Sequence, residues 1–190
     1  MKRALLLSAM LAFTAPAAFA AEPNVAMQSY LNDVVMPWSH EGVLVDAVKA
    51  QNAKTSGYDA AQIEALDQTW RAEVGAAATP TIDPVLHNAA ADFLRNQVEA
   101  SGGVITEVFI MDAKGLNVAA SGVTSDYWQG DEEKHQMTYS KGPDAVHFSE
   151  IEFDESSQTY QAQISISLTD PANGEVIGAM TVGIVADALM

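Results

Sequence analysis

The side chains best suited to hold a small molecule gather in one irregular segment, residues 123–142. Its candidate binding residues are Asp126, Tyr127, Trp128, His135 and Tyr139. Aromatic rings supply large apolar walls with polar tips, and one or two polar groups then orient a ligand. An aromatic and acidic pocket without a nearby arginine favours a cationic or neutral ligand. The alternative is structural: Trp128 would fill a sheet face while Tyr127 and Asp126 cap a short helix.

A further candidate, His147, lies in the segment 145–153 (AVHFSEIEF). Counting alternate residues back from Ile151 places Ser149 and His147 on one face of a strand. His147 then either points into a ligand cavity or is a buried, hydrogen-bonded core histidine. The acidic residues Glu150 and Glu152 occupy alternate positions of the same segment, and we interpret them as a solvated face.

No catalytic or metal-binding pattern emerges from the remaining residues. The four histidines are His40, His87, His135 and His147. None forms a His-x-His or His-x-x-x-His pair, and the chain has no cysteine. The run Glu132-Glu133-Lys134-His135 has a carboxylate–histidine spacing that occurs often by chance. Neither a Gly-x-Ser-x-Gly elbow nor a phosphate-binding glycine loop occurs. We therefore expect no metal site, no cofactor and no enzyme activity.

The charge balance excludes one class of partner. The chain of 190 residues carries 9 Lys and Arg against 25 Asp and Glu, a formal net charge of −16. Such a surface repels phosphate backbones, so we expect no nucleic-acid partner. A hydrophobic fraction of 48% is enough for a folded domain with a real core.

Residues 1–20 resemble an export signal. Lys2 and Arg3 give a basic start, residues 4–13 are apolar, and Ala18-Phe19-Ala20 fits a small-x-small cleavage site. A retained anchor is the alternative, but the apolar run is too short to span a bilayer comfortably. We predict cleavage after Ala20 and a periplasmic location.

Helical patterns dominate residues 21–82, the expected N-terminal helical region. Apolar residues recur every three or four positions from Met27 to Trp38, and Pro37 should kink or interrupt that helix. A second helix should start at Asp59, where Gln62 completes a capping-box spacing. A third should open at Asp83-Pro84 and stop at residues 101–103.

The period then changes to that of strands. We expect strands at residues 104–111, 116–120, 145–153, 158–169 and 176–186, with a turn at residues 112–115. The last strand is the most apolar, so it should lie centrally, beside the first. The fold class is therefore α+β: a PAS-like five-stranded antiparallel sheet with N-terminal helices, over which residues 123–142 form a crossover lid.

Residues 108–131 (VFIMDAKGLNVAASGVTSDYWQGD) resemble the single Cache domains, PAS-like sensors that face outward from bacterial cells. Asp170-Pro171, Gly174 and the terminal strand with Gly178 and Gly183 resemble them more loosely. The resemblance implies a sensor domain over residues 83–190, with a small metabolite held between the sheet and the crossover. The amino-acid-binding subset of the family uses an arginine near its Trp-Tyr pair, whereas Arg71 and Arg95 lie outside the crossover here.

The sequence thus predicts a freestanding periplasmic sensory module that binds a small-molecule ligand and signals through a separate membrane sensor kinase or chemoreceptor. The alternative is a non-catalytic structural or interaction protein with a filled PAS-like core. Both allow a homodimer through the N-terminal helix, whose apolar stripe ends at Trp38.

Overall fold

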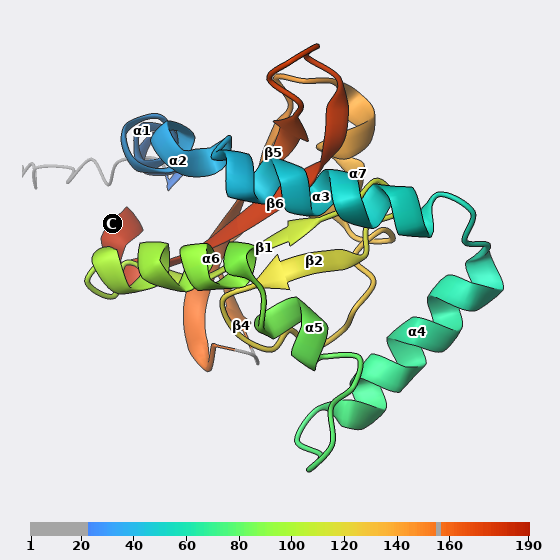
Figure 1. Ribbon diagram of the computed structural model, residues 1–190. Helices are drawn as coiled ribbons and strands as arrows, with labels where there is room; N and C mark the ends of the chain where they lie inside the picture. The colour runs from blue at the N-terminus through green and yellow to red at the C-terminus, as the bar shows by residue number, and fades with distance from the viewer. Residues whose placement is uncertain (1–22, 155–156) are drawn as a thin grey trace, which may run out of the picture.

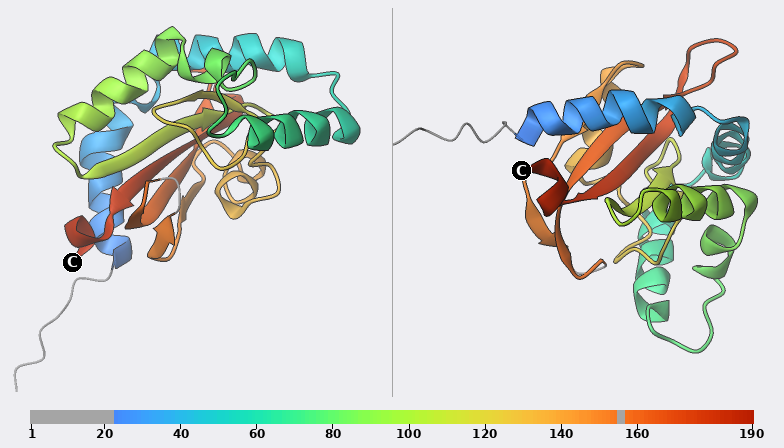
Figure 2. Two further views of the ribbon diagram at one scale, coloured as in Figure 1. Left: turned by 90° about the horizontal axis from the view of Figure 1, so that it is seen from below. Right: turned by 90° about the vertical axis from the view of Figure 1, so that its left-hand side faces the viewer.

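The computed structural model describes residues 23–154 and 157–190. One antiparallel sheet lies between a layer of helices and an irregular crossover (Figures 1 and 2). The helices are α1 (Pro23–Tyr30), the π-helical turn Leu31–Val35, α2 (Met36–Ser39), α3 (Gly42–Thr55), α4 (Ala60–Glu73), α5 (Asp83–Leu86), α6 (Ala89–Ala100) and α7 (Glu133–Gln136). Short 3-10 turns follow at Tyr139–Lys141 and Ala186–Leu189. The predicted export signal, residues 1–20, lies outside the described residues.

The sheet contains the strands β1 (Ile105–Met111), β2 (Asn117–Ala120), β3 (Val146–Phe148), β4 (Glu152–Asp154), β5 (Thr159–Thr169) and β6 (Val176–Val185). Their order is β2-β1-β6-β5-β3, with β4 also paired to β5, and every pairing is antiparallel. The last strand therefore lies between β1 and β5, as its apolar sequence predicts. This arrangement confirms the predicted PAS-like α+β fold class.

The segment expected as one strand at 145–153 forms two strands instead. Val146 pairs with Ile166 and Phe148 with Ile164, whereas Glu152 pairs with Gln161. The sum of paired residue numbers rises by one between the two strands, so one extra residue is inserted, as in a β-bulge. The hydroxyl of Ser149 takes over one ladder position by accepting from the Gln163 backbone N–H at 2.8 Å.

The helix boundaries follow local chemistry, with one difference from expectation. Asp59 and Gln62 form the predicted capping box at the start of α4. The chain before Pro37 passes through a π-helical turn, because proline has no N–H to continue the ladder. The helix expected from Asp83 onward is interrupted: α5 ends after one turn, and Asn88 caps α6 by accepting from the Ala91 N–H at 2.9 Å.

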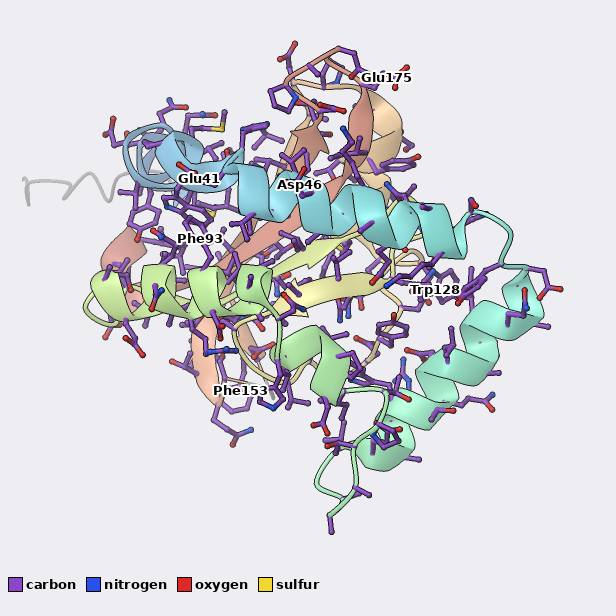
Figure 3. All side chains as sticks on the ribbon, in the orientation of Figure 1. Glu41, Asp46, Phe93, Trp128, Phe153 and Glu175 are labelled. Carbon is purple, nitrogen blue, oxygen red and sulfur yellow. The ribbon has the colours of Figure 1, made fainter. Side chains whose placement is uncertain are left out.

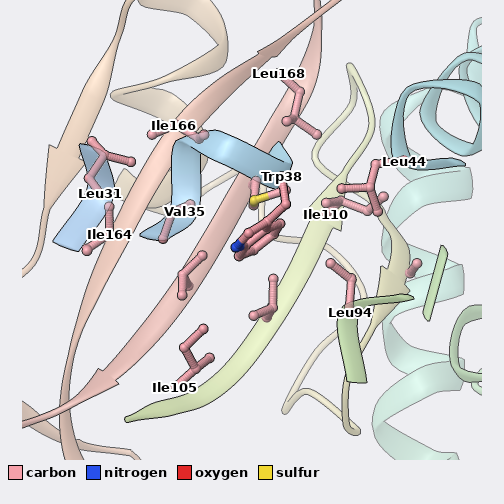
Figure 4. Close-up of a cluster of buried hydrophobic side chains, with 14 of the residues drawn as sticks. Leu31, Val35, Trp38, Leu44, Leu94, Ile105, Ile110, Ile164, Ile166 and Leu168 are labelled. Carbon is pink, nitrogen blue, oxygen red and sulfur yellow. The ribbon is translucent and has the colours of Figure 1, made fainter. Parts of the chain in front are cut away.

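The two sheet faces carry different side chains. Ala162, Ile164, Ile166 and Leu168 of β5 enter the main core together with side chains of α1–α3 and α6 (Figure 4). Gln161, Gln163, Ser165 and Ser167 alternate with them and face the crossover. Ser165 and Thr181 are buried on that second face, with their hydroxyls 3.0 Å apart. One apolar and one partly polar face result, as the alternation in β5 predicts.

The turn at Asp112–Gly115 joins three parts of the fold. The buried Asp112 carboxylate accepts from the backbone N–H groups of Lys114 and Leu116 and from the Thr55 hydroxyl of α3, at 2.8, 3.0 and 2.8 Å. Gly115 has φ +81°, and a Cβ there would meet the Gly130 Cα at 2.4 Å. The turn thus fixes both α3 and the start of the crossover. Within the described residues, no helix is long and apolar enough to cross a membrane.

A close approach inside the sheet gives a direct test. A Cβ at Gly178 would lie 2.1 Å from the Met111 carbonyl oxygen. We expect Gly178→Ala to lower the free energy of unfolding by about 1–3 kcal/mol, measured by urea titration, because the backbone must move. Gly57→Ala is the matched control, since nothing lies within 4 Å of a Cβ there. Equal stability of the two variants would contradict the close packing of β1 on β6.

Candidate functional site

A groove of about 710 Å³ opens between the crossover and the strands β3, β4 and β5. It is lined by Ser125, Asp131, Glu132, Glu133, Lys134, His147, Phe148, Ser149, Glu150, Glu152, Phe153, Asp154, Gln161 and Gln163. Figure 2 (left) shows α3 and α6 on one side of the sheet and the crossover on the other. The groove therefore occupies the sheet face that the main core leaves free.

Strand geometry explains the polar side of the groove. His147 pairs with Ser165, and Gln161 and Gln163 lie on the same face of the neighbouring strand β5. The inserted residue between β3 and β4 changes the register, and Glu150, Glu152 and Asp154 all line the groove. The rings of Phe148 and Phe153 add apolar surface.

The electrostatics of the groove are strongly acidic. Six of its lining residues are acidic, and its basic groups are Lys134 and His147. The Lys134 ammonium lies 2.8 Å from a Glu132 carboxylate oxygen and 5.5 Å from the centre of the Phe109 ring. His147 lies 3.6 Å from Glu133 through its Nε2. Both basic groups are thus already close to carboxylates, and the remaining field favours a positive charge.

A buried carboxyl lies beside this polar face. Glu107 of β1 is 8% exposed and accepts from the side-chain amides of Gln161 and Gln163 at 2.7 and 3.1 Å. Burial raises the pKa of Glu107, and the negative charge of Asp154 adds to the effect. The two amide hydrogen bonds and Lys134 oppose that rise in pKa without cancelling it.

The first half of the crossover is anchored to α4. Asp67 accepts from the backbone N–H groups of Tyr127 and Trp128 at 2.9 and 3.0 Å. Arg71 donates to Asp67 at 2.7 Å and to Asp126 at 3.1 Å. The sequence places Arg71 outside the crossover, yet the fold brings its guanidinium onto it. The arginine is paired with these two protein carboxylates.

Trp128 and Tyr127 also point away from the groove. The Trp128 indole N–H donates to the Lys114 carbonyl at 2.8 Å, which fastens the crossover to the hairpin turn. The Tyr127 ring stacks on the buried Trp70 ring of α4, with centroids 5.3 Å apart. Figure 3 shows Trp128 near the end of α3, on the other side of the molecule from Phe153 of the groove.

His135 and Tyr139 form a stacked pair, with ring centroids 5.1 Å apart. His135 is buried, and its Nε2 lies 3.2 Å from the Asp112 carbonyl oxygen. Burial lowers the pKa of His135, against the opposing effect of that hydrogen bond, so the neutral ring is favoured at neutral pH. Among the described residues, no group of three or more His, Asp and Glu side chains could hold a metal ion.

Of the six candidate residues, His147 is among those that line the groove. The other five lie in the α4 anchor or in the His135–Tyr139 stack, and their role in binding stays a prediction. Lys134, Gln161 and Gln163 also line the groove, and the sequence alone did not predict them there. The alternation of β5 carries the signal for the two glutamines, because it places them on the face that also holds His147.

Searches with the sequence and with the fold give different outcomes. No protein-family model matches the sequence, and no curated protein matches it significantly. Similar solved structures include the ligand-binding domain of the Campylobacter jejuni chemoreceptor Tlp3 in complex with 4-methylisoleucine, at 11% identity and a TM-score of 0.42. The sensor domain of the V. cholerae histidine kinase DctB shows 13% identity and a TM-score of 0.41. The extracellular domain of the putative histidine kinase rpHK1S-Z16 shows 14% identity and a TM-score of 0.44.

These are Cache-type sensory domains. The similar regions cover 86, 87 and 86% of this chain, but only 62, 58 and 60% of the three solved chains. The chain thus spans about three fifths of their length. The similar solved structures are thus domains of the kind that the hairpin and crossover residues resemble.

The α4 anchor can be tested by hydrogen exchange. Asp67→Ala removes the acceptor of two backbone N–H groups, and leaving buried donors unpaired costs about 1–3 kcal/mol each. We expect lower stability and faster amide exchange at Tyr127 and Trp128. Glu64→Ala, on the exposed face of the same helix, should change stability by less than about 0.5 kcal/mol. Unchanged exchange at the two amides in Asp67→Ala would contradict the anchor.

Glu107 gives a prediction about pH. Because its pKa is raised in the folded protein, its bound proton contributes stability below the ordinary pKa, and this contribution is lost as pH rises through the raised value. Glu107→Gln cannot ionise, so its stability relative to the natural protein should increase as pH rises from about 4 to about 8. Urea unfolding across this range measures the difference.

The control for loss of charge alone is Glu99→Gln, at an exposed position of α6. A pH profile for Glu107→Gln that matches the Glu99→Gln profile would show that burial does not perturb this carboxyl.

Proposed function

We propose that this chain is a sensory module that binds a small metabolite in the groove between the crossover and β3–β5. The observation that carries the proposal is the groove itself, about 710 Å³ of space beside a polar sheet face. This volume lies within the range of small-molecule sites. A space of this size lined by polar side chains supports a small-molecule binding role over a purely structural one.

The charge of the groove favours a cationic ligand. Six acidic residues line it, while its one lysine is paired with Glu132. A wall that combines carboxylates with low-dielectric protein concentrates cations and repels anions. The amide groups of Gln161 and Gln163 and the ring of Phe153 would add hydrogen bonds and apolar contact. A short aliphatic diamine fits this combination.

The crossover connects the groove to helix α4. Residues 131–134 line the groove, while residues 126–128 of the same segment are held by Asp67 and Arg71 of α4. A ligand that draws residues 131–134 toward β4 would change the balance of crossover conformations. We propose that α4 reports this change to a membrane sensor kinase or chemoreceptor.

The proposal includes export to the periplasm, which rests on the signal-like residues 1–20. The recipient of the signal and a homodimer through the N-terminal helix stay predictions.

The ligand class can be tested with two probes of equal length and opposite charge. We expect the full chain to bind putrescine, measured by calorimetry, and not succinate. Glu150→Gln combined with Glu152→Gln should weaken putrescine binding about tenfold, because two carboxylates are lost from the groove. Added salt should weaken it further in the natural protein.

Glu41→Gln combined with Asp46→Asn is the matched control. It removes the same charge from exposed positions that lie in the helical layer (Figure 3). We expect it to leave putrescine affinity nearly unchanged. Binding of succinate in place of putrescine, or equal losses in the two double variants, would contradict a cationic ligand in this groove.

A further inference from the structure

A second cavity, of about 460 Å³, lies between α3, α4 and α5 and shares no lining residue with the groove. Figure 1 shows these three helices arranged around β2. The lining of this second cavity includes Tyr127 of the crossover, Val118 of β2, Leu66 of α4 and Pro84 of α5. The crossover thus contributes to two separate cavities, with Tyr127 in one and residues 131–134 in the other.

Three hydrogen-bond donors in this cavity are unused. The side-chain polar atoms of Lys54, Tyr58 and Tyr127 have no hydrogen bond or ion pair within the part of the chain that the structure describes. The other polar groups of the wall are already engaged: Thr55 donates to Asp112, and the Asn88 amide donates to backbone carbonyls. The lysine and the two phenols are therefore available to a ligand.

The two phenol groups interact electrostatically, and this interaction affects the pKa of Tyr127. Burial raises the pKa of Tyr127, and the charge of Asp112 and the proximity of Tyr58 raise it further. The Tyr127 hydroxyl therefore keeps its proton at any physiological pH and remains a donor. The Asp112 carboxylate already accepts from four donors of its own.

The charge of this cavity is opposite to that of the groove. Its lining contains one lysine and no acidic residue, in a chain with 25 acidic residues against 9 basic ones. The apolar part of the wall includes Leu66, Pro80, Pro84 and Val85. A lysine and two phenol donors beside an apolar wall suit an anionic acceptor group attached to a flat apolar body.

We propose that this cavity is a second ligand site, selective for small aromatic carboxylates. The carboxylate accepts from the Lys54 ammonium and the two phenols, and the ring packs against the prolines and Leu66. The site needs no ligand in the groove, so it goes beyond the proposed sensory function. An occupant touches α3, α4 and Tyr127 together, and it therefore strengthens the contact between the crossover and α4.

The test uses the full chain and benzoate as the probe, with binding measured by calorimetry. We expect benzoate to bind, and Lys54→Gln, Tyr58→Phe and Tyr127→Phe each to weaken it at least about fivefold. These substitutions remove a charge or a hydroxyl without opening a hole, and a thermal melt of each variant confirms that it folds. Lys141→Gln and Tyr160→Phe, at exposed positions away from the cavity, should leave benzoate affinity unchanged.

The two sites can be separated with the same proteins. Glu150→Gln combined with Glu152→Gln should leave benzoate affinity unchanged, and Lys54→Gln should leave putrescine affinity unchanged. Absence of benzoate binding up to about 10 mM would overturn the second site. Benzoate binding that ignores Lys54 and both tyrosines, or that depends on the groove carboxylates, would also overturn it. Neither result bears on putrescine binding, so failure of the second site and failure of the sensor proposal remain distinguishable.

Discussion

The buried carboxylate of Asp112 is the interaction on which the arrangement of this fold depends. It receives two backbone N–H groups of its own turn and two side-chain donors from α3. Its residue also offers a carbonyl to His135 of the crossover. A buried carboxylate is costly unless its oxygens are hydrogen-bonded, so these partners cannot separate independently. Helix α3, the hairpin and the crossover are therefore held in one geometry, and the donors Gln51 and Thr55 also line the cavity between α3, α4 and α5.

The sequence predicted those parts of the fold that depend on short-range chemistry. The turn after Asp112, the capping box at Asp59 and the two faces of β5 each follow from residues within a few positions of one another. The break between α5 and α6 and the division of 145–153 into β3 and β4 were not predicted. At the first break Asn88 adds a tertiary bond to the Val118 carbonyl to its local cap on the Ala91 N–H, and at the second Ser149 replaces a ladder group opposite Gln163. No local pattern shows such a partner in advance.

The candidate site, too, was predictable from the sequence only where a regular local period applies. Alternation could place His147 with Gln161 and Gln163, because strands impose a period of two. It could not give the directions of residues 126–139, which follow no regular period. The directions of residues 126–128 depend on Asp67 and Arg71, more than 50 positions earlier in the chain. The aromatic crossover residues were therefore recognised by type, but the surface that each one faces could not be derived.

The crossover contributes residues to two cavities of opposite charge, and this shared segment can couple binding in one cavity to binding in the other. Residues 131–134 face an acidic groove, and Tyr127, a few positions earlier, faces a cavity whose one charged lining residue is Lys54. If an occupant of one cavity changes the affinity of the other through the crossover, the second occupant changes the affinity of the first by the same free energy, because coupling between binding sites is reciprocal. The Asp67 carboxylate holds the chain between the two, so the strength of the coupling depends on how rigidly α4 keeps that contact. The α4 anchor is therefore the place where the two cavities would influence each other.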